Sequence, residues 1–235
     1  MQFHQRFIAP GLQTLVIAGL YNEDKLQSLF SQYFPLYNSE IQYDIKETPI
    51  STSTCQEALQ LDHSSQASIA LGKLSIRNSH NAYPIHSLLT KILGGYFGSR
   101  LMKKIREEEG LTYGIHAYNV HLKAGSYMQI LADVKFDSVD KSIELILEQL
   151  DNLQHEAISI EELNTVKNYM LGEFVNDSNT VFDFAELYKV LLLRNLPDDY
   201  YQSYYKKINM ISSNDVLDMA RQSYVEDQFS IIRVL

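Results

Sequence analysis

The chain has 235 residues, and its 29 acidic against 20 basic side chains give a net charge of −9. This balance, with no Lys/Arg-rich run, argues against a nucleic-acid-binding protein and against binding to an anionic membrane surface. Hydrophobic residues make up 45% of the chain, as in ordinary globular proteins, and no apolar run approaches the ~20 residues needed to span a bilayer.

The cysteine content and the N-terminus restrict the chain further. Cys55 is the single cysteine, so the chain has no internal disulfide, its fold does not depend on oxidation, and the compartment is left open. The N-terminus lacks the basic-then-apolar order of a signal peptide. We therefore expect a soluble chain of unknown localisation, either a piece of a longer precursor or a separate subunit.

The first part of the chain predicts an α/β-type opening. Residues 14–20 form an apolar run that ends near a glycine, which predicts a buried strand. Asn22 is a suitable N-cap for an amphipathic helix that stops at Pro35. The polar segment 39–54 predicts a loop with one edge strand near 41–45.

The middle of the chain predicts strands around one helix. Two strands, 56–61 and 66–72, follow each other closely, which predicts that they pair in antiparallel fashion. A helix over 82–93 has its apolar residues at core spacing and leads into a glycine-rich stretch. Segments 114–122 and 126–134 then predict a β-hairpin with a short glycine-containing loop.

The C-terminal part predicts mostly helices. Asp137 is expected to cap one helix, and residues 159–162 match a capping box that opens another. Segment 181–193 is apolar on nearly every face, which predicts either full burial or a partner surface. Three elements follow in order, namely a tyrosine-rich stretch, a short helix and a final strand: 200–205, a helix from Ser213, and 229–234.

The glycine-rich stretch after the 82–93 helix is the most informative part of the sequence. Gly94, Gly95 and Gly98 allow positive φ angles and close approach of the backbone. Ser99 can cap a short helix that ends near Gly110, where a helix favours a left-handed residue. Three adjacent glutamates crowd the C-terminal end of this helix, where its dipole disfavours them, so local stability does not explain them.

Two polar residues near this helix end are candidates for a functional site. Arg106 lies at the edge of the buried stripe of the short helix, and Tyr113 follows in the next strand. A guanidinium carries several hydrogen-bond donors in a rigid plane, and a phenol carries one more. Such donors can bind a peptide carbonyl or stabilise an oxyanion. The alternative is that Arg106 pairs with Glu109 while Tyr113 packs in the sheet.

Motifs for other chemistries are missing. Neither H-E-x-x-H nor its inverted form H-x-x-E-H occurs, and His155-Glu156 has no second histidine at helical spacing. His116 and His121 differ by an odd number within one strand, so they face opposite sides of it. G-x-S-x-G and both phosphate-binding glycine motifs are also absent. The residues therefore predict no metal site, no catalytic nucleophile and no nucleotide site on this chain.

Residues 93–113 contain LGG, SRL, IRE and GLTY at a spacing that resembles the C-terminal, metal-free domain of pitrilysin-type zinc peptidases. This family of inverted-motif (H-x-x-E-H) enzymes includes insulin-degrading enzyme, the mitochondrial processing peptidase and the core proteins of the bc1 complex. Three further segments of this chain resemble markers of the family: LVIAG at 15–19, QASIALG at 66–72, and EEL followed by a lysine at 161–167.

The resemblance implies an α+β fold, a two-layer α/β sandwich with a largely antiparallel sheet covered on one face by helices. It implies that residues 1–235 form a single metal-free domain with no cofactor of its own and with zinc on a partner domain. In that family, an Arg and a Tyr of this domain contact the peptide substrate, and those positions correspond to Arg106 and Tyr113. Gly94, Gly95 and Gly98 correspond to the glycine-rich turn.

We therefore expect a non-metal-binding domain or subunit of a zinc metalloendopeptidase that closes the peptide chamber and is inactive alone. Its partner would be an H-x-x-E-H-containing domain or subunit, within one chain or in a homo- or heterodimer. The alternative is a structural or scaffolding protein of the same fold without a proteolytic role. A third hypothesis, independent metal-dependent hydrolysis, requires stoichiometric zinc on the isolated chain.

Overall fold

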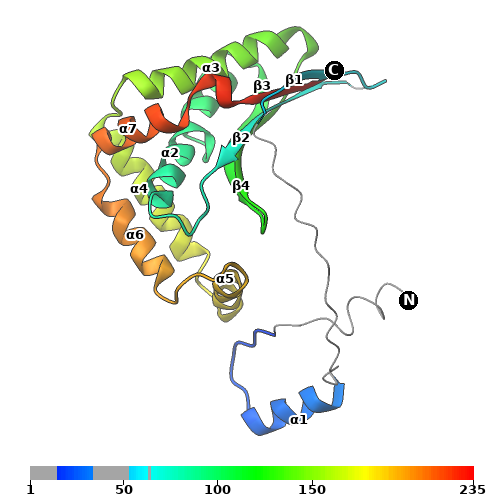
Figure 1. Ribbon diagram of the computed structural model, residues 1–235, viewed down its shortest axis with the longest axis vertical. Helices are drawn as coiled ribbons and strands as arrows, with labels where there is room; N and C mark the ends of the chain where they lie inside the picture. The colour runs from blue at the N-terminus through cyan, green and yellow to red at the C-terminus, as the bar shows by residue number, and fades with distance from the viewer. Residues whose placement is uncertain (1–14, 34–52, 63–64) are drawn as a thin grey trace. The chain divides into compact units, whose positions relative to one another are not determined.

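The computed structural model describes residues 15–33, 53–62 and 65–235 (Figure 1). The predicted edge strand near 41–45 and most of the predicted 39–54 loop lie outside these residues. None of the described helices combines the length and the apolar character that crossing a membrane requires.

The chain divides into two compact units. One comprises Met1–Thr48 and Phe174–Leu196, and the other comprises Pro49–Glu173 and Pro197–Leu235. The expectation of a single domain over 1–235 stays a prediction.

Two helices of the smaller unit follow the sequence prediction, but one predicted strand does not form. Helix α1 (Glu23–Tyr33) begins where the Asn22 side chain accepts a 2.9 Å hydrogen bond from the Lys25 backbone amide. Helix α5 (Val181–Arg194) exposes most of its apolar residues, so full burial of this segment is wrong. Residues 15–20 are not a strand, because an apolar run becomes one only where a neighbouring strand completes its hydrogen bonds.

The larger unit is built on a five-stranded sheet with the order β1-β5-β2-β4-β3. Every neighbouring pair is antiparallel except β1 with β5, which is parallel. The predicted hairpin is confirmed, with β3 and β4 joined through residues 122–125. The strands are β1 (Gln56–Leu59), β2 (Ala67–Ser75), β3 (Thr112–His121), β4 (Ser126–Val134) and β5 (Ser230–Val234).

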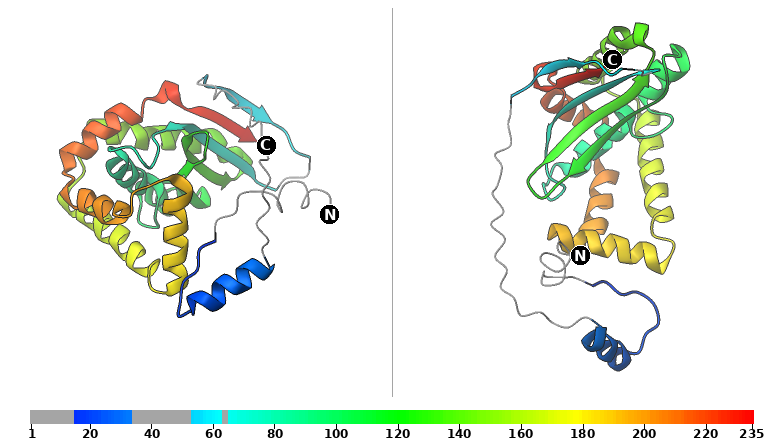
Figure 2. Two further views of the ribbon diagram at one scale, coloured as in Figure 1. Left: turned by 60° about the horizontal axis from the view of Figure 1, so that its bottom comes forward. Right: turned by 90° about the vertical axis from the view of Figure 1, so that its right-hand side faces the viewer.

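The predicted antiparallel pairing of the first two of these strands is wrong. The C-terminal strand β5 lies between β1 and β2, as Figure 2 shows, and pairs with both. Its residues Ile231 and Arg233 face Leu71 and Ile69 of β2 in register. Strands that are neighbours in sequence are thus separated here by a strand from the far end of the chain, which uses both of its edges for pairing.

Helices cover one face of this sheet, which confirms the predicted two-layer α/β sandwich (Figure 1). Helix α2 packs on β3, and α3 contacts β2, while α7 packs against both helices. Asp137 does not cap α3, since it lies in the 3-10 turn η3 (Phe136–Ser138) just before that helix. The remaining elements are α2 (Tyr83–Gly94), η2 (Met102–Glu108), α3 (Val139–His155), α4 (Ile160–Asn176), α6 (Tyr200–Met210), α7 (Ser213–Ser223) and η4 (Glu226–Gln228).

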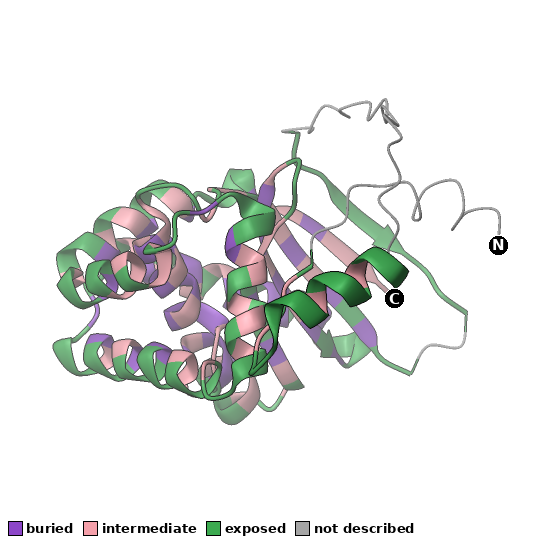
Figure 3. Cartoon of the chain, turned by 90° about the horizontal axis from the view of Figure 1, so that it is seen from below, coloured by how far each residue is buried: buried purple, intermediate pink, exposed green. Residues whose placement is uncertain are grey.

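The hydrophobic core lies between this helical layer and one face of the sheet (Figure 3). Alternate residues of β2 and β4 are buried, so each strand sends one set of side chains into the core and the other set to the open face. The largest fully buried side chains include Ile69, Leu71, Leu88, Leu89, Ile92, Leu93, Leu101, Ile105, Ile115, Met128 and Ile130.

Candidate functional site

The glycines after α2 bring the helix end close to the sheet. A β-carbon on Gly94 would lie 2.8 Å from the Cβ and the backbone nitrogen of Ala117 in β3, and one on Gly98 would lie 2.8 Å from the Tyr96 ring. Close backbone approach is therefore confirmed. The expected positive φ is wrong for Gly94, Gly95 and Gly98. Gly94 is the last residue of helix α2, and Gly95 has a right-handed φ of −89°, so the chain leaves the helix without a left-handed residue.

The next helix begins without the predicted side-chain cap. The Ser99 hydroxyl is buried and has no hydrogen-bond partner among the described residues, while the Ser99 carbonyl accepts a 3.0 Å bond from the Lys103 amide. The helix then adopts π-helical geometry over Met102–Glu108. Its predicted buried stripe is confirmed, since Leu101, Met102 and Ile105 are all buried. Insertions of this wide helical geometry are frequent at functional sites.

Arg106 projects from this helix over an aromatic ring. Its guanidinium lies 4.6 Å from the centroid of the Phe97 ring, a cation–π geometry. Within the described part of the chain, no hydrogen bond or ion pair involves Arg106. The alternative that Arg106 pairs with Glu109 is therefore wrong, and the donors of its guanidinium remain free for a ligand.

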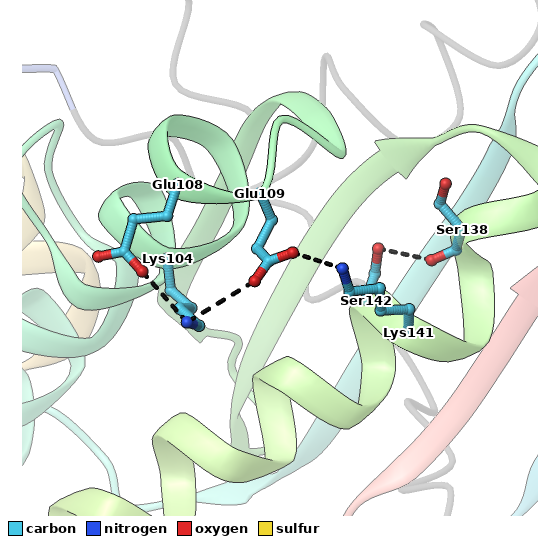
Figure 4. A network of polar contacts seen from close by, with 6 residues as sticks. All are labelled: Lys104, Glu108, Glu109, Ser138, Lys141 and Ser142. Atoms are coloured by element: carbon cyan, nitrogen blue, oxygen red, sulfur yellow. Dashed lines mark hydrogen bonds and ion pairs between the residues drawn. The ribbon is translucent and has the colours of Figure 1, made fainter.

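The glutamates at the end of this helix are held by lysines (Figure 4). Lys104 donates a hydrogen bond to Glu108 at 3.1 Å and lies 3.7 Å from Glu109. Lys141 of α3 donates to Glu109, and this bond lowers the pKa of the Glu109 carboxyl. The bond to Glu108 raises the pKa of Lys104. Local ion pairs thus explain Glu108 and Glu109, contrary to the expectation from the helix dipole alone.

Tyr113 stands at the start of β3, fully presented to solvent. Gly110 ends the preceding helix with φ of 64°, as predicted, and the Leu111 amide donates back to the Ile105 carbonyl at 3.0 Å. The register with β4 then shifts, so Tyr113 and Gly114 together oppose one residue. Tyr113 is 90% exposed, so the alternative that it packs in the sheet is wrong.

Tyr113 borders a concavity on the open face of the sheet. This concavity has a volume of about 570 Å³, and all its residues belong to the larger unit. No hydrogen bond or cation–π contact joins Arg106 to Tyr113, and Arg106 does not line the concavity. Side chains on its surface come from four strands: Ser68, Ala70, Tyr113, His116, Leu131, Asp133, Ile232 and Val234.

The described residues do not fit a zinc ion. No group of three or more His, Cys, Asp or Glu side chains in residues 15–33, 53–62 and 65–235 is arranged to hold a metal. His121 has its two ring nitrogens 2.9 Å from the Tyr83 and Ser126 hydroxyls, while His116 lies on the opposite, open face. The odd spacing of these two histidines predicts this separation.

Sequence reasoning missed three residues at this site. Phe97 makes the cation–π contact with Arg106, and Ser68 and Asp133 line the concavity beside Tyr113. The alternation of β4 contains a signal for Asp133, because its neighbours Ala132 and Val134 both face the core. A charged residue on the open side of a central strand was therefore predictable.

The fold and this site define an α/β domain of zinc-peptidase type without a metal centre among its described residues. The sequence model of the peptidase M16 inactive domain matches residues 1–170. The chain therefore belongs to the peptidase M16 family, as a member of its inactive-domain group.

Curated relatives are similar over part of their length. The uncharacterized zinc protease YmxG of Bacillus subtilis is 25% identical over 165 residues, which are 69% of this chain and 40% of that protein. The non-peptidase homolog YmxG of Helicobacter pylori is 25% identical over 130 residues, which are 55% of this chain and 30% of that protein. The chain thus spans less than half the length of these relatives.

Solved structures share the fold. The peptidase M16 inactive domain from Pseudomonas fluorescens superposes with a TM-score of 0.77 at 21% identity, covering 91% of this chain and 51% of that one. A protease from Helicobacter pylori gives a TM-score of 0.76 at 19% identity, covering 93% and 54%. These likenesses establish the fold alone.

Proposed function

We propose that this chain is the non-metal-binding part of an M16-type zinc metalloendopeptidase. It would join a domain or subunit that carries H-x-x-E-H and zinc, and close the peptide chamber with the open face of its sheet. The observation that supports this most is Tyr113, a 90% exposed phenol at a β-bulge beside a concavity. No hydrogen bond within the described residues uses its phenol, so the hydroxyl is available to a peptide ligand beside the concavity.

The two predicted residues would have different tasks. Tyr113 can donate its phenol proton to a carbonyl oxygen that gains negative charge during peptide hydrolysis. Arg106 can grip a carbonyl or carboxylate of the peptide, because no carboxylate of the described chain uses its donors. The metal and the general base would come from the partner.

A structural role is the alternative, and the name of one relative favours it. The Helicobacter pylori relative is called a non-peptidase homolog, whereas the Bacillus subtilis relative is called a zinc protease. A scaffold would need the fold and its docking surface but neither Arg106 nor Tyr113. In the scaffold role the guanidinium of Arg106 would only face solvent, whereas in the peptidase role its donors would bind a peptide carbonyl or carboxylate.

Reconstituted peptide cleavage tests the proposal. The H-x-x-E-H-containing partner from the same organism is assayed on a quenched fluorescent peptide library with and without this chain. We expect cleavage only with both components, and a kcat/KM at least tenfold lower with Arg106→Ala, as for the loss of a charged hydrogen bond. Lys103→Ala, an exposed cation on the same helix, is the matched control and should leave cleavage unchanged. Full activity with Arg106→Ala would favour the scaffold.

A further inference from the structure

The concavity on the open face has an ordered chemical layout across four strands. Asp133 of β4 pairs in register with Ser68 of β2, which pairs in turn with Val234 of β5. On the other side, the bulge places Tyr113 opposite Asp133. Three of the four side chains in this first row are therefore polar.

The second row, one step further along the same face, is mainly apolar. Leu131 of β4 is in register with Ala70 of β2 and with His116 of β3, and Ala70 is in register with Ile232 of β5. On β2, β4 and β5 each residue lies two positions from its counterpart in the first row, and on β3 the bulge makes the separation three, so both rows face the concavity. An apolar floor thus leads directly to a polar edge.

Among the described residues that line this concavity, Asp133 is the only acidic one, and none is a lysine or an arginine. Its Oδ1 accepts a 2.5 Å hydrogen bond from the Ser68 hydroxyl, which fixes the orientation of the carboxylate. No ion pair within residues 65–235 involves Asp133, so its second oxygen is free to accept from a ligand. The Thr112 hydroxyl donates to the Asp133 backbone carbonyl at 2.6 Å, which anchors the strand beside it.

We infer that this concavity binds a lysine or arginine side chain of a peptide, with Asp133 as the specificity-determining residue. The methylene stem of such a side chain would lie on Ala70, Leu131 and Ile232, and its cationic head would reach Asp133. The net charge of −9 adds a favourable long-range field for a basic ligand. This inference rests on the proposed peptide-binding function and names the substrate class for that site.

Direct binding to the isolated full chain tests the inference without the partner. Fluorescein-labelled nonapeptides that differ at one central position, lysine, arginine, norleucine or glutamate, are titrated by fluorescence anisotropy. Norleucine keeps the methylene stem and removes the charge, so the comparison isolates the carboxylate. We expect the lysine and arginine peptides to bind about tenfold more tightly than the norleucine peptide, as for a charge-assisted hydrogen bond.

Variants assign the preference to one residue. Asp133→Asn keeps the shape and an acceptor for Ser68, and should reduce the lysine-over-norleucine ratio to about one. Asp137→Asn is the matched control, because Asp137 also accepts a hydroxyl bond, from Ser138 at 2.9 Å, and does not line the concavity. It should keep the full preference. Raising the salt from about 0.05 M to about 0.5 M should weaken the preference for the charged peptides.

The remaining outcomes overturn the inference. Equal binding of lysine and norleucine peptides, a preference that survives Asp133→Asn, or no binding of any peptide would each do so. Loss of partner association in Asp133→Asn, with peptide selectivity intact, would assign this face to the partner instead. None of these results decides the proposed function, which is tested separately by the loss of cleavage in the Arg106→Ala and Tyr113→Phe variants of the reconstituted pair.

Discussion

Gly94 at the end of α2 lies directly against Ala117 of β3, with room for a hydrogen but not for a methyl group. A β-carbon on Gly94 would lie 2.8 Å from the Cβ and from the backbone nitrogen of Ala117. We expect Gly94→Ala to lower the free energy of unfolding by about 1–3 kcal/mol, the usual range for overpacking. Urea denaturation of the full chain measures this change.

Gly172 of α4 provides the control for this prediction. A β-carbon there would meet no atom within 4 Å, and the residue lies inside a helix. Gly172→Ala should therefore leave stability unchanged or raise it by up to about 1 kcal/mol. Equal stability of Gly94→Ala and wild type would show that the helix end is not held against the sheet.

Burial of His86 predicts a pH-dependent stability. His86 of α2 is 4% exposed, and its Nε2 lies 3.4 Å from the Ser75 hydroxyl. Desolvation, with smaller effects of Lys73 and His121, lowers the pKa of His86 to about 4. Because this pKa lies below the unfolded value of about 6.5, the neutral form is favoured by folding. The resulting stability is complete above pH 6.5 and is lost as the pH falls toward 4, by up to about 3 kcal/mol.

Chemical denaturation between pH 7.5 and pH 4 tests this linkage. His86→Gln removes the titrating group and should flatten the curve over this interval relative to wild type. His155→Gln is the control, since His155 lies exposed at the end of α3 and should retain the wild-type slope. Parallel curves for wild type and His86→Gln would contradict a buried neutral histidine.

The ion pair of Arg100 and Glu162 links the glycine-rich segment to α4, and we expect its coupling energy to be large for a surface pair. The guanidinium donates two hydrogen bonds to the carboxylate, both at 2.9 Å, and the two side chains are 21% and 26% exposed. A double-mutant cycle with Arg100→Ala and Glu162→Ala should give a coupling energy of about 1–3 kcal/mol. This value lies between those expected for exposed and for buried ion pairs. The exposed pair of Lys189 and Glu186 should give less than about 1 kcal/mol. Equal coupling energies would contradict this difference.

Much of the fold could be predicted from local sequence, because helices and hairpins depend on nearby residues. The apolar spacing in α2 and the glycine-containing loop between β3 and β4 are both patterns that extend over about a dozen residues or fewer. The place of β5 could not be predicted, because its pairing with β1 joins residues such as Gln56 and Ile231, far apart in the chain. The run 15–20 shows the same dependence, since strand propensity needs a partner strand.

The candidate site was predictable in its residue types but not in its contacts. The spacing of Arg106 and Tyr113 and the turn at Gly110 followed from glycine and helix patterns. The ring of Phe97 under Arg106 could not be predicted, because it depends on the path of the turn. Glu162 was assigned to a capping box, yet only its amide bonds to Ser159, at 3.0 Å, while its carboxylate binds Arg100. The partner of a long side chain depends on the tertiary structure, so the local sequence does not predict it.

The central claim is that Tyr113 acts on the peptide, and the kcat of the reconstituted pair tests it most directly. Tyr113→Phe removes one hydroxyl and should lower kcat by about 10²-fold, as for loss of one oxyanion donor, with unchanged assembly. Tyr118→Phe, at another exposed tyrosine of β3, should leave kcat at the wild-type value. The same kcat for Tyr113→Phe and wild type would contradict the account.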